Sequence, residues 1–352
     1  ESITVSGAAP VVDTQNVRQQ KVVSSELVQV LPTGTMTVAD IGAITPGLSG
    51  TVNVGGSSGT YSMNSVAVLT FHGKAHAKAM YDGMRVNNME GAGSTTGFMV
   101  SPNTPEEWTV ETGGVSAESD ASGVVVNYIP KEGGNTITGS FSGLYSNDSL
   151  QSDNLSDELR QRGLNSVNDA LHVYNADAAL GGPVKRDRLW FFAATRWTGS
   201  KTQLAGIYYN ATQGTPIYTE DQSRPGFRND RLRGAAGRVT WQVSDKSKLN
   251  VFTDIQTNVV RRGEFAAPEA QVLFNFWPQG LVQATWNAPL TSKLLLEAGA
   301  GATISHWPTP AQPEVKPTDI SILELSTNFR YNAATLLGGP KDSDRFIQRF
   351  SL

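Results

Sequence analysis

The second half of the chain alternates long polar connections with very short turns between predicted β-strands. Apolar–polar alternation predicts nine strands, at 136–146, 170–181, 188–198, 232–243, 248–258, 280–288, 293–306, 321–332 and 345–352. Their connections run long (147–169), short (182–187), long (199–231), short (244–247), long (259–279), short (289–292), long (307–320) and then intermediate (333–344). Connections this long are uncommon inside compact soluble domains. Strands of a membrane β-barrel, by contrast, leave the bilayer through long loops on one side and return through tight turns on the other.

The side chains of these strands alternate between two faces, as a barrel wall between lipid and lumen requires. In 293–306 one face is wholly apolar and consists of Leu294, Leu296, Ala298, Ala300, Ala302 and Ile304. In 249–258 the apolar face carries Val251 and Ile255, and the other face carries Phe252, Asp254 and Gln256. Aromatic residues near strand ends add support, because amphipathic rings settle at a lipid interface; they are Tyr145, Trp190, Trp197, Trp286, Trp307 and Tyr331. A soluble β-sandwich would also alternate, so the pattern alone leaves that alternative open.

Composition narrows the class of protein further. The 352 residues include no cysteine, which excludes a disulfide scaffold and a thiolate metal site. The 28 basic and 32 acidic residues give a net charge of −4, which predicts no nucleic-acid partner. No stretch approaches the roughly 20 apolar residues of a spanning helix. The chain begins at Glu1 and ends in a strand-like stretch, so we expect both ends to have been cut from a longer precursor.

The first 135 residues have a different organisation. Residues 24–32 and 37–47 each show a capping residue, an apolar side and a proline stop, which predicts two short helices. Short β-like runs follow, separated by glycine-rich loops. We therefore predict an extended segment at 1–20, a small α+β domain at 21–135, and a direct connection through Gly133 and Gly134 to the strands at 136–352.

Two motifs in the α+β domain carry a family resemblance. The sequence YDGMRVNN contains Asp82 and Gly83, which predict a tight reversal between two strands. The stretch 108–131, WTVETGGVSAESDASGVVVNYIPK, resembles the later plug segment of TonB-dependent outer-membrane transporters: Glu111 and Gly114 match that family's Glu and Gly, and its apolar strand is matched by Val124, Val125, Val126 and Ile129. The sequence departs from the family's pattern at two places. Thr112–Gly113 stand where many relatives have an arginine-containing turn, and Asn127–Pro130 (NYIP) replace the commoner NIIT. These variants, with GGPVKRDRLWFF (181–192), resemble the Oar-like branch, whose members carry a carboxypeptidase-regulatory-like domain before the plug.

The resemblance implies an α+β plug domain followed by an antiparallel transmembrane β-barrel. A plugged lumen requires about 22 strands, so we expect the nine strands to be the N-terminal part of the barrel. It also implies energised uptake of a bulky ligand through the outer membrane of a Gram-negative bacterium. The energy-coupling partner is TonB, which pairs with a short extended segment before the plug. Our candidate for this TonB box is Glu1, Ser2, Ile3, Thr4 and Val5, because backbone pairing favours an extended β-branched run. The alternative is that these residues end a linker or strand of an upstream domain.

Ligand contact is expected from polar and aromatic residues of plug loops, namely Tyr61, Asn64, Tyr81, Arg85, Asn87 and Asn88. The alternative for each is a hydrogen bond to the barrel wall. Lumen-facing charges are expected to contact the plug, namely Arg238, Asp254, Glu297, Glu324 and Arg330. The ligand class stays open among siderophore, oligosaccharide and peptide, and outer-membrane lipid is the other partner. Residues 149–166 predict a short helix on the first long loop.

Catalysis is not expected. His72 and His76 have the spacing of a helical metal pair, but there is no HExxH motif and no third ligand in the sequence nearby. The glycine-rich stretch 55–62 lacks the Gly-Lys-Ser/Thr of a phosphate loop. We therefore predict no enzyme activity, no metal and no cofactor. A structural or adhesive outer-membrane or secreted β-protein without transport remains the alternative function.

Overall fold

The structure, a computed structural model, describes residues 19–30, 44–49, 69–73, 77–87, 99–101, 103–113, 124–152, 154–164, 166–263, 265–335 and 344–351. Most of the predicted helix at 37–47 lies outside these residues. Among the described residues, no helix combines the length and the apolar character needed to cross a membrane.

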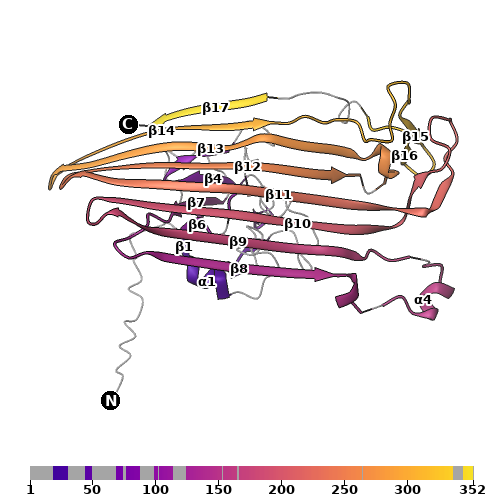
Figure 1. Cartoon of the computed structure of the whole chain (residues 1–352), viewed down its shortest axis with the longest axis horizontal. Coiled ribbons are helices and arrows are strands. Elements are labelled where there is room, and N and C mark those ends of the chain that lie inside the picture. Colours follow the sequence, from indigo (N-terminus) through magenta and orange to yellow (C-terminus); the bar gives the residue numbers. More distant parts are fainter. Residues whose placement is uncertain are drawn as a thin grey trace, which may run out of the picture.

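Eight antiparallel strands form one large sheet, which we call the barrel sheet (Figure 1). The strands are β8 (Thr138–Asn147), β9 (Ala170–Lys185), β10 (Leu189–Asn210), β11 (Glu220–Ser244), β12 (Ser247–Arg262), β13 (Val272–Thr291), β14 (Leu294–His306) and β17 (Asp344–Ser351). Each pairs with the next along the chain, except that β17 pairs directly with β14. Short turns lie at one end of the sheet, the turn end, and the long connections lie at the other, the loop end.

The prediction of a barrel strand at 321–332 is wrong. This segment forms a separate hairpin at the loop end, made of β15 (Ile322–Glu324) and β16 (Phe329–Tyr331). The four residues between them form a turn in which Asn328 has a φ of +57°. Asparagine adopts this left-handed conformation at low cost, so the chain reverses where the alternation predicts continuous extension. The described barrel strands number eight, and β17 ends at the turn end.

Two of the predicted long connections are shorter than expected because the strands continue beyond the apolar part of the wall. β10 has 22 residues and β11 has 25, so their connection shrinks from 199–231 to 211–219. The connection predicted at 259–279 likewise shrinks to 263–271. The extensions of β10 and β11 are rich in polar residues, and a polar strand has no apolar face by which the sequence could reveal it. The added part of β13 is instead mostly apolar and lacks a clear alternation.

The predicted faces of the wall are confirmed on β12 and at the loop-end part of β14, whereas residues 294–297 of β14 are exposed on both faces. Val251 and Ile255 are 41% and 50% exposed on the outward face, whereas Phe252, Asp254 and Gln256 are buried on the inward face. On β14, Ile304 points outward between the buried Thr303 and Ser305.

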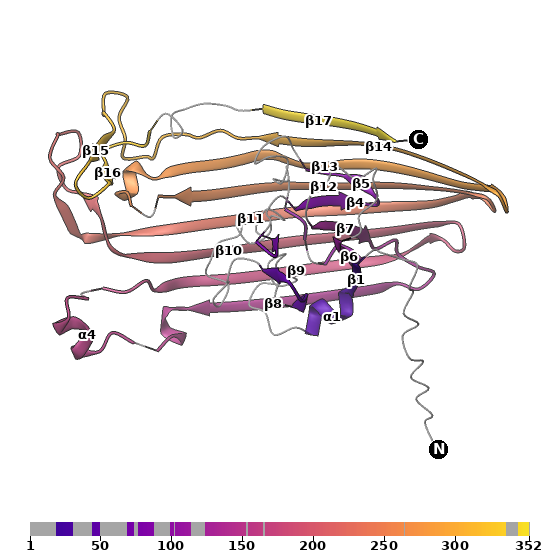
Figure 2. The same cartoon turned by 180° about the vertical axis from the view of Figure 1, so that it is seen from behind.

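A smaller five-stranded sheet, the plug sheet, lies against the inward face of the barrel sheet (Figures 1 and 2). Its order is β1 (Gln19–Ser24), β6 (Pro105–Gly113), β7 (Val125–Pro130), β4 (Lys78–Tyr81) and β5 (Met84–Arg85), and only β4 and β7 are parallel. The predicted first helix is confirmed as α1 (Ser25–Val30), where the Leu27 amide donates to Ser24 Oγ at 3.3 Å. β2 (Leu48–Ser49) and β3 (Thr70–Phe71) form a separate two-stranded sheet, and Leu48 packs in the same buried cluster as the plug sheet.

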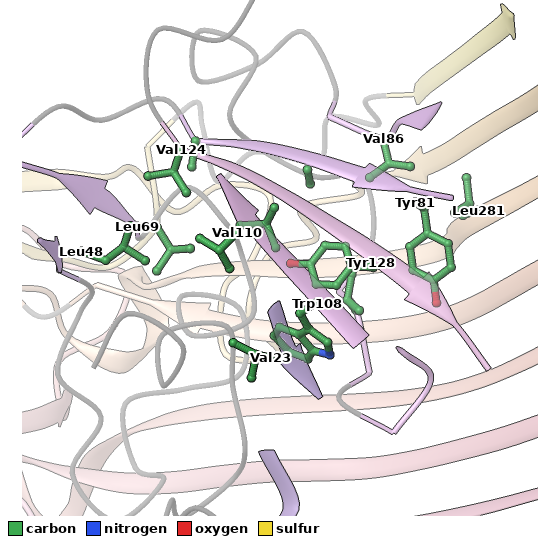
Figure 3. Packing of buried hydrophobic residues seen from close by; sticks show 14 of the residues in the cluster. Val23, Leu48, Leu69, Tyr81, Val86, Trp108, Val110, Val124, Tyr128 and Leu281 are labelled. Atoms are coloured by element: carbon green, nitrogen blue, oxygen red, sulfur yellow. The ribbon is translucent and has the colours of Figure 1, made fainter. Parts of the chain in front are cut away.

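The core of the molecule lies in the plug sheet and reaches the barrel wall (Figure 3). Trp108 of β6 meets Tyr128 of β7 edge to face, with ring centroids 5.2 Å apart. Phe252 and Leu281 of the barrel sheet belong to the same buried cluster. Plug and wall therefore share apolar packing.

Short helices lie at the loop end. The predicted helix within 149–166 is confirmed as α4 (Asp157–Gln161), which begins where Ser156 Oγ accepts from the Leu159 amide. Two 3₁₀ turns, η3 (Asp148–Leu150) and η4 (Pro268–Ala270), lie in the first and third long connections.

Candidate functional site

An aromatic stack is one of the contacts between plug and wall. Tyr81, the last residue of β4, stacks on Phe252 of β12, with ring centroids 4.5 Å apart and planes 27° from parallel. The Tyr81 hydroxyl donates to Thr104 Oγ1 at 3.1 Å, and its carbonyl accepts from Gln283 Nε2 at 2.7 Å. Burial raises the pKa of Tyr81 well above its ordinary value, so the hydroxyl stays protonated as a donor.

An ionic contact adjoins this stack. Arg238 of β11 is 2% exposed, and its guanidinium lies 2.7 Å from Asp82 Oδ2 and 3.1 Å from Glu132 Oε1. Lys248 of β12 also pairs with Glu132. Burial raises the pKa of Asp82, while the nearby guanidinium of Arg238 opposes the rise. One guanidinium thus joins the turn after β4 to the segment that leads from the plug into β8.

The tight turn that presents Asp82 follows from its sequence. Tyr81 pairs with Met84, so β4 and β5 form a hairpin with two central residues. Asp82 and Gly83 have φ values of +46° and +76°, as a type I′ turn requires at both positions. The Gly83 amide donates to Asn127 Oδ1 at 3.0 Å. The predicted Asp-Gly reversal is therefore confirmed.

A third plug–wall contact uses the side-chain amide of Gln256 on β12. Its Oε1 accepts from the Met99 amide at 2.8 Å, and its Nε2 donates to the Met99 carbonyl. The same Nε2 donates to Asp254 Oδ1 at 2.9 Å. A wall side chain thus pairs with plug backbone as a neighbouring strand would, and it needs no particular side chain from the plug.

At the loop end, a second cluster joins three connections around Asn332. Its Oδ1 accepts from Asn210 Nδ2 at 3.0 Å, and its Nδ2 donates to the Thr215 carbonyl at 2.6 Å. Its amide donates to Glu269 Oε1 at 3.4 Å. We call residues 210–219, 265–271 and 312–332 the loop cap. Burial raises the pKa of Glu269 within it.

Cations and aromatic rings support the loop cap from the strands beneath. Arg261 donates to Gln312 Oε1 at 2.6 Å and to the Tyr209 hydroxyl at 3.3 Å, and its guanidinium lies 4.7 Å from the Phe227 ring centroid. Arg224 lies 4.0 Å from the centroid of Tyr209. Sequence reasoning missed this cluster because its members come from connections and strand ends that are distant in the sequence.

The predicted ligand-contact residues fall into two groups. Tyr61, Asn64 and Asn88 lie outside the described residues, as do the TonB-box candidates Glu1 to Val5. Tyr81 and Asn87 are fully buried in the plug, where Asn87 Oδ1 accepts from the Ala79 amide at 2.6 Å, and Arg85 is half-buried. These three side chains have partners within the protein, and their contact with a ligand stays a prediction.

The predicted lumen charges have mixed outcomes. Arg238 contacts the plug as predicted, and Asp254 is buried on the inward face. Glu297 is exposed on β14. The prediction is wrong for Glu324 and Arg330, which lie in the loop-end hairpin, where Arg330 Nη1 donates to Ser321 Oγ. The misplaced strand at 321–332 explains both errors. Tyr331, predicted at a lipid interface, is buried in the same hairpin for the same reason.

Of the histidine pair, His72 has a φ of +47° and contacts the Phe71 ring, and His76 lies outside the described residues. In the described part of the chain, no three His, Asp or Glu side chains are close enough to hold a metal ion.

Comparison with known proteins shows which solved structures share this fold. No protein-family model and no curated protein sequence matches the chain. Solved structures do match, among them the outer membrane transporter YddB from Escherichia coli, with a TM-score of 0.63 and 14% identity over 94% of this chain and 44% of that one. The ferric enterobactin receptor PfeA from Pseudomonas aeruginosa, solved as a single-site mutant, gives a TM-score of 0.58 and 13% identity over 96% and 46%. The siderophore receptor PirA from Acinetobacter baumannii gives 0.56 and 14% over 94% and 43%.

The chain has the fold of the TonB-dependent outer-membrane receptors. It spans less than half the length of each of these three structures. In terms of that fold, the plug sheet belongs to the plug and the barrel sheet to the first part of the wall. The finer resemblance to the Oar-like branch is not confirmed by these structures.

Proposed function

We propose that this chain is the plug (21–135) and the first part of the barrel (136–352) of a TonB-dependent transporter in the outer membrane of a Gram-negative bacterium. The observation that carries the proposal is a folded plug held against the inward face of a wall whose outward face is apolar. Such a wall suits lipid outside and a polar lumen inside. The receptor fold of the matched structures supports the same function.

The plug–wall contacts support a plug that closes the lumen and can also be rearranged when TonB applies force to it. Among the described residues, the ionic contact is carried by Arg238 with Asp82 and Glu132, and by Lys248 with Glu132. Gln256 adds hydrogen bonds to backbone. Polar contacts of this kind can be exchanged for water when the plug moves, so rearrangement costs less than it would for a wholly apolar interface.

The matched structures suggest a class of ligand for this chain but no single compound. YddB is described as an outer membrane transporter, and PirA and PfeA as receptors for a siderophore and for ferric enterobactin. We propose a bulky ligand for this chain, taken up from the loop end, with a ferric siderophore tested first and an oligosaccharide or a peptide next. Residues 1–5 are proposed as the segment that pairs with TonB.

Uptake in a strain that carries or lacks TonB tests the proposal. We expect the intact protein to fractionate with the outer membrane and to support accumulation of a radiolabelled ferric siderophore or oligosaccharide only when TonB is present. Ile3→Pro should abolish uptake, because proline removes a backbone donor from the paired strand. Ile3→Val keeps the donor and is the matched control. Outer-membrane insertion without TonB-dependent uptake of any of the three ligand classes would favour the structural or adhesive alternative.

A further inference from the structure

The outward face of the barrel sheet changes character along β11. From the turn end, its outward residues are Trp241, Val239, Gly237 and Ala235, and then Arg233 and Arg231. Both arginines are exposed, and Leu232 between them is buried on the inward face. Trp241 and Arg233 are eight residues apart, which is about 26 Å along a strand and about 20 Å along the membrane normal at a tilt of about 40°. This agrees with an apolar band about 25 Å tall.

Aromatic side chains mark the same level on the neighbouring strands. Trp197 of β10 is 56% exposed and pairs with Arg233, whose guanidinium lies 5.3 Å from its ring centroid. Two residues further toward the loop end, Arg231 pairs with Gly199, and Gly199 pairs with Tyr174 of β9. A Cβ on Gly199 would stand 2.7 Å from the Tyr174 hydroxyl oxygen, so that ring covers the glycine. Amphipathic rings at this level indicate the lipid headgroup region.

A third cation completes the group. Lys201 of β10 pairs with Asn229, which places it diagonal to Arg231 on the outward face, about 7–8 Å away. Its Nζ lies 4.2 Å from the Phe227 ring centroid. The ion pairs within the described residues include none that joins a carboxylate to Lys201, Arg231 or Arg233. Arg228 in the same strand is different, because it pairs with Asp230 at 3.4 Å.

We propose that Lys201, Arg231 and Arg233 form a binding site for the phosphate groups of an outer-leaflet glycolipid such as lipid A. The proposal rests on the outer-membrane location proposed above. A guanidinium group binds two phosphate oxygens at once, through two parallel N–H···O hydrogen bonds. Among the described residues none of the three cations has a carboxylate partner, so all three are available to an anion on the lipid side. The occupant is a lipid rather than a free anion, because the cations continue directly from the apolar band and the aromatic rings, where acyl chains and headgroup sugars lie.

Binding of lipid A to the purified, intact protein in detergent micelles tests the site. Diphosphoryl lipid A is titrated and the bound fraction is read by native mass spectrometry. We expect Arg231→Gln with Arg233→Gln to weaken binding about 10- to 30-fold, since each basic residue near an anionic headgroup contributes about fivefold in affinity. Lys substitution at both positions keeps the charges and should retain most of the affinity. Dephosphorylated lipid A should bind the native protein and the Gln variant equally.

A matched control removes two exposed cations from the turn end, with Arg186→Gln and Lys293→Gln. This pair should leave the affinity for diphosphoryl lipid A within about twofold. Equal losses in both double variants, or no loss at Arg231 and Arg233, would overturn the proposal. Folding is checked separately by heat-modifiable migration on gels. Because micellar binding requires neither TonB nor a transported ligand, failure here leaves the transport proposal standing, and the reverse also holds.

Discussion

Phe252 of the barrel sheet stacks on Tyr81 of the plug sheet, with their ring centroids 4.5 Å apart. Neither side chain is exposed to solvent, and both belong to the buried apolar cluster that the described parts of plug and wall share. The inward face of the wall is otherwise largely polar on this strand, with Asn250, Asp254 and Gln256. The aromatic pair is therefore an apolar anchor within a mostly polar interface.

Removal of this anchor should destabilise the plug. We expect Phe252→Ala to lower the free energy of unfolding by about 3–5 kcal/mol, because it deletes a buried ring and leaves a cavity. The measurement is urea unfolding in detergent, followed by near-ultraviolet circular dichroism. Val251→Ala, on the adjacent outward residue, is the control and should cost about 1 kcal/mol or less in the micelle. Equal losses in the two variants would show that Phe252 does not anchor the plug.

The alternation in the sequence is enough to predict that Phe252 points inward. A period of two assigns faces by position rather than by polarity, so an apolar ring is placed beside Asp254 and Gln256, and the structure confirms this. The same reasoning fails at 321–332, where the chain reverses at Asn328. The preference of Asn328 for a left-handed turn outweighs the apolar–polar alternation of this segment, which pairs with itself and not with a strand of the barrel sheet.

The partners within the site are harder to predict than its faces. Arg238 is predicted to point to the lumen and to contact the plug, but its pairing with Asp82 depends on the register of β11 and on the plug's position. Neither is encoded locally, because the two residues are 156 positions apart in the chain. The Asn332 cluster is hidden for a similar reason, since it unites connections that are distant in sequence.

Asp82 should give a measurable pH dependence. Burial raises its pKa above the ordinary value of 3.8, so the folded protein binds this proton more tightly than the unfolded chain does. The contribution of Asp82 to stability is therefore greatest below pH 3.8 and falls as the pH rises through the raised pKa. We expect the stability difference between the native protein and Asp82→Asn, from urea midpoints, to decrease between about pH 3.5 and pH 7.

Arg238→Gln provides the second arm of this experiment. The guanidinium lowers the pKa of Asp82 against the effect of burial, so its removal should raise that pKa further and enlarge the decrease with pH. A stability difference that increases with pH would contradict the assignment, because it would require a folded pKa below the ordinary value.

Asn332 should hold the loop cap together. Asn332→Ala removes three side-chain hydrogen bonds, with Asn210, Thr215 and Gly214. It also places alanine at a φ of +70°, a left-handed conformation that asparagine adopts more readily. We expect hydrogen exchange at 211–219 to accelerate by about 10- to 100-fold, which corresponds to about 1.4–2.7 kcal/mol of local stability. Asn328→Ala is the matched control, with a similar φ of +57° in an exposed turn. Its effect should stay within the β15–β16 hairpin, and a comparable acceleration at 211–219 would argue against the role of the Asn332 side chain.

The junction between plug and barrel should tolerate a side chain at Gly134 but not at Gly133. Gly133 has a φ of +77°, and a Cβ there would clash with the Phe191 carbonyl oxygen, whereas no atom lies within 4 Å of a Cβ on Gly134. The contact at Gly133 is with backbone of β10, so a clash could be relieved only by moving a barrel strand or the start of β8.

Gly133→Ala combines that clash with left-handed strain of about 1–2 kcal/mol. We therefore expect it to lower the unfolding free energy by about 2–4 kcal/mol, and to weaken the adjacent pairing of Glu132 with Arg238. Gly134→Ala should change stability by less than about 1 kcal/mol. Thermal unfolding in detergent compares the two, and hydrogen exchange at 131–140 reports on the junction itself. If both alanine variants unfolded at the same temperature, the close approach of Gly133 to β10 would not be a feature of the folded protein in solution.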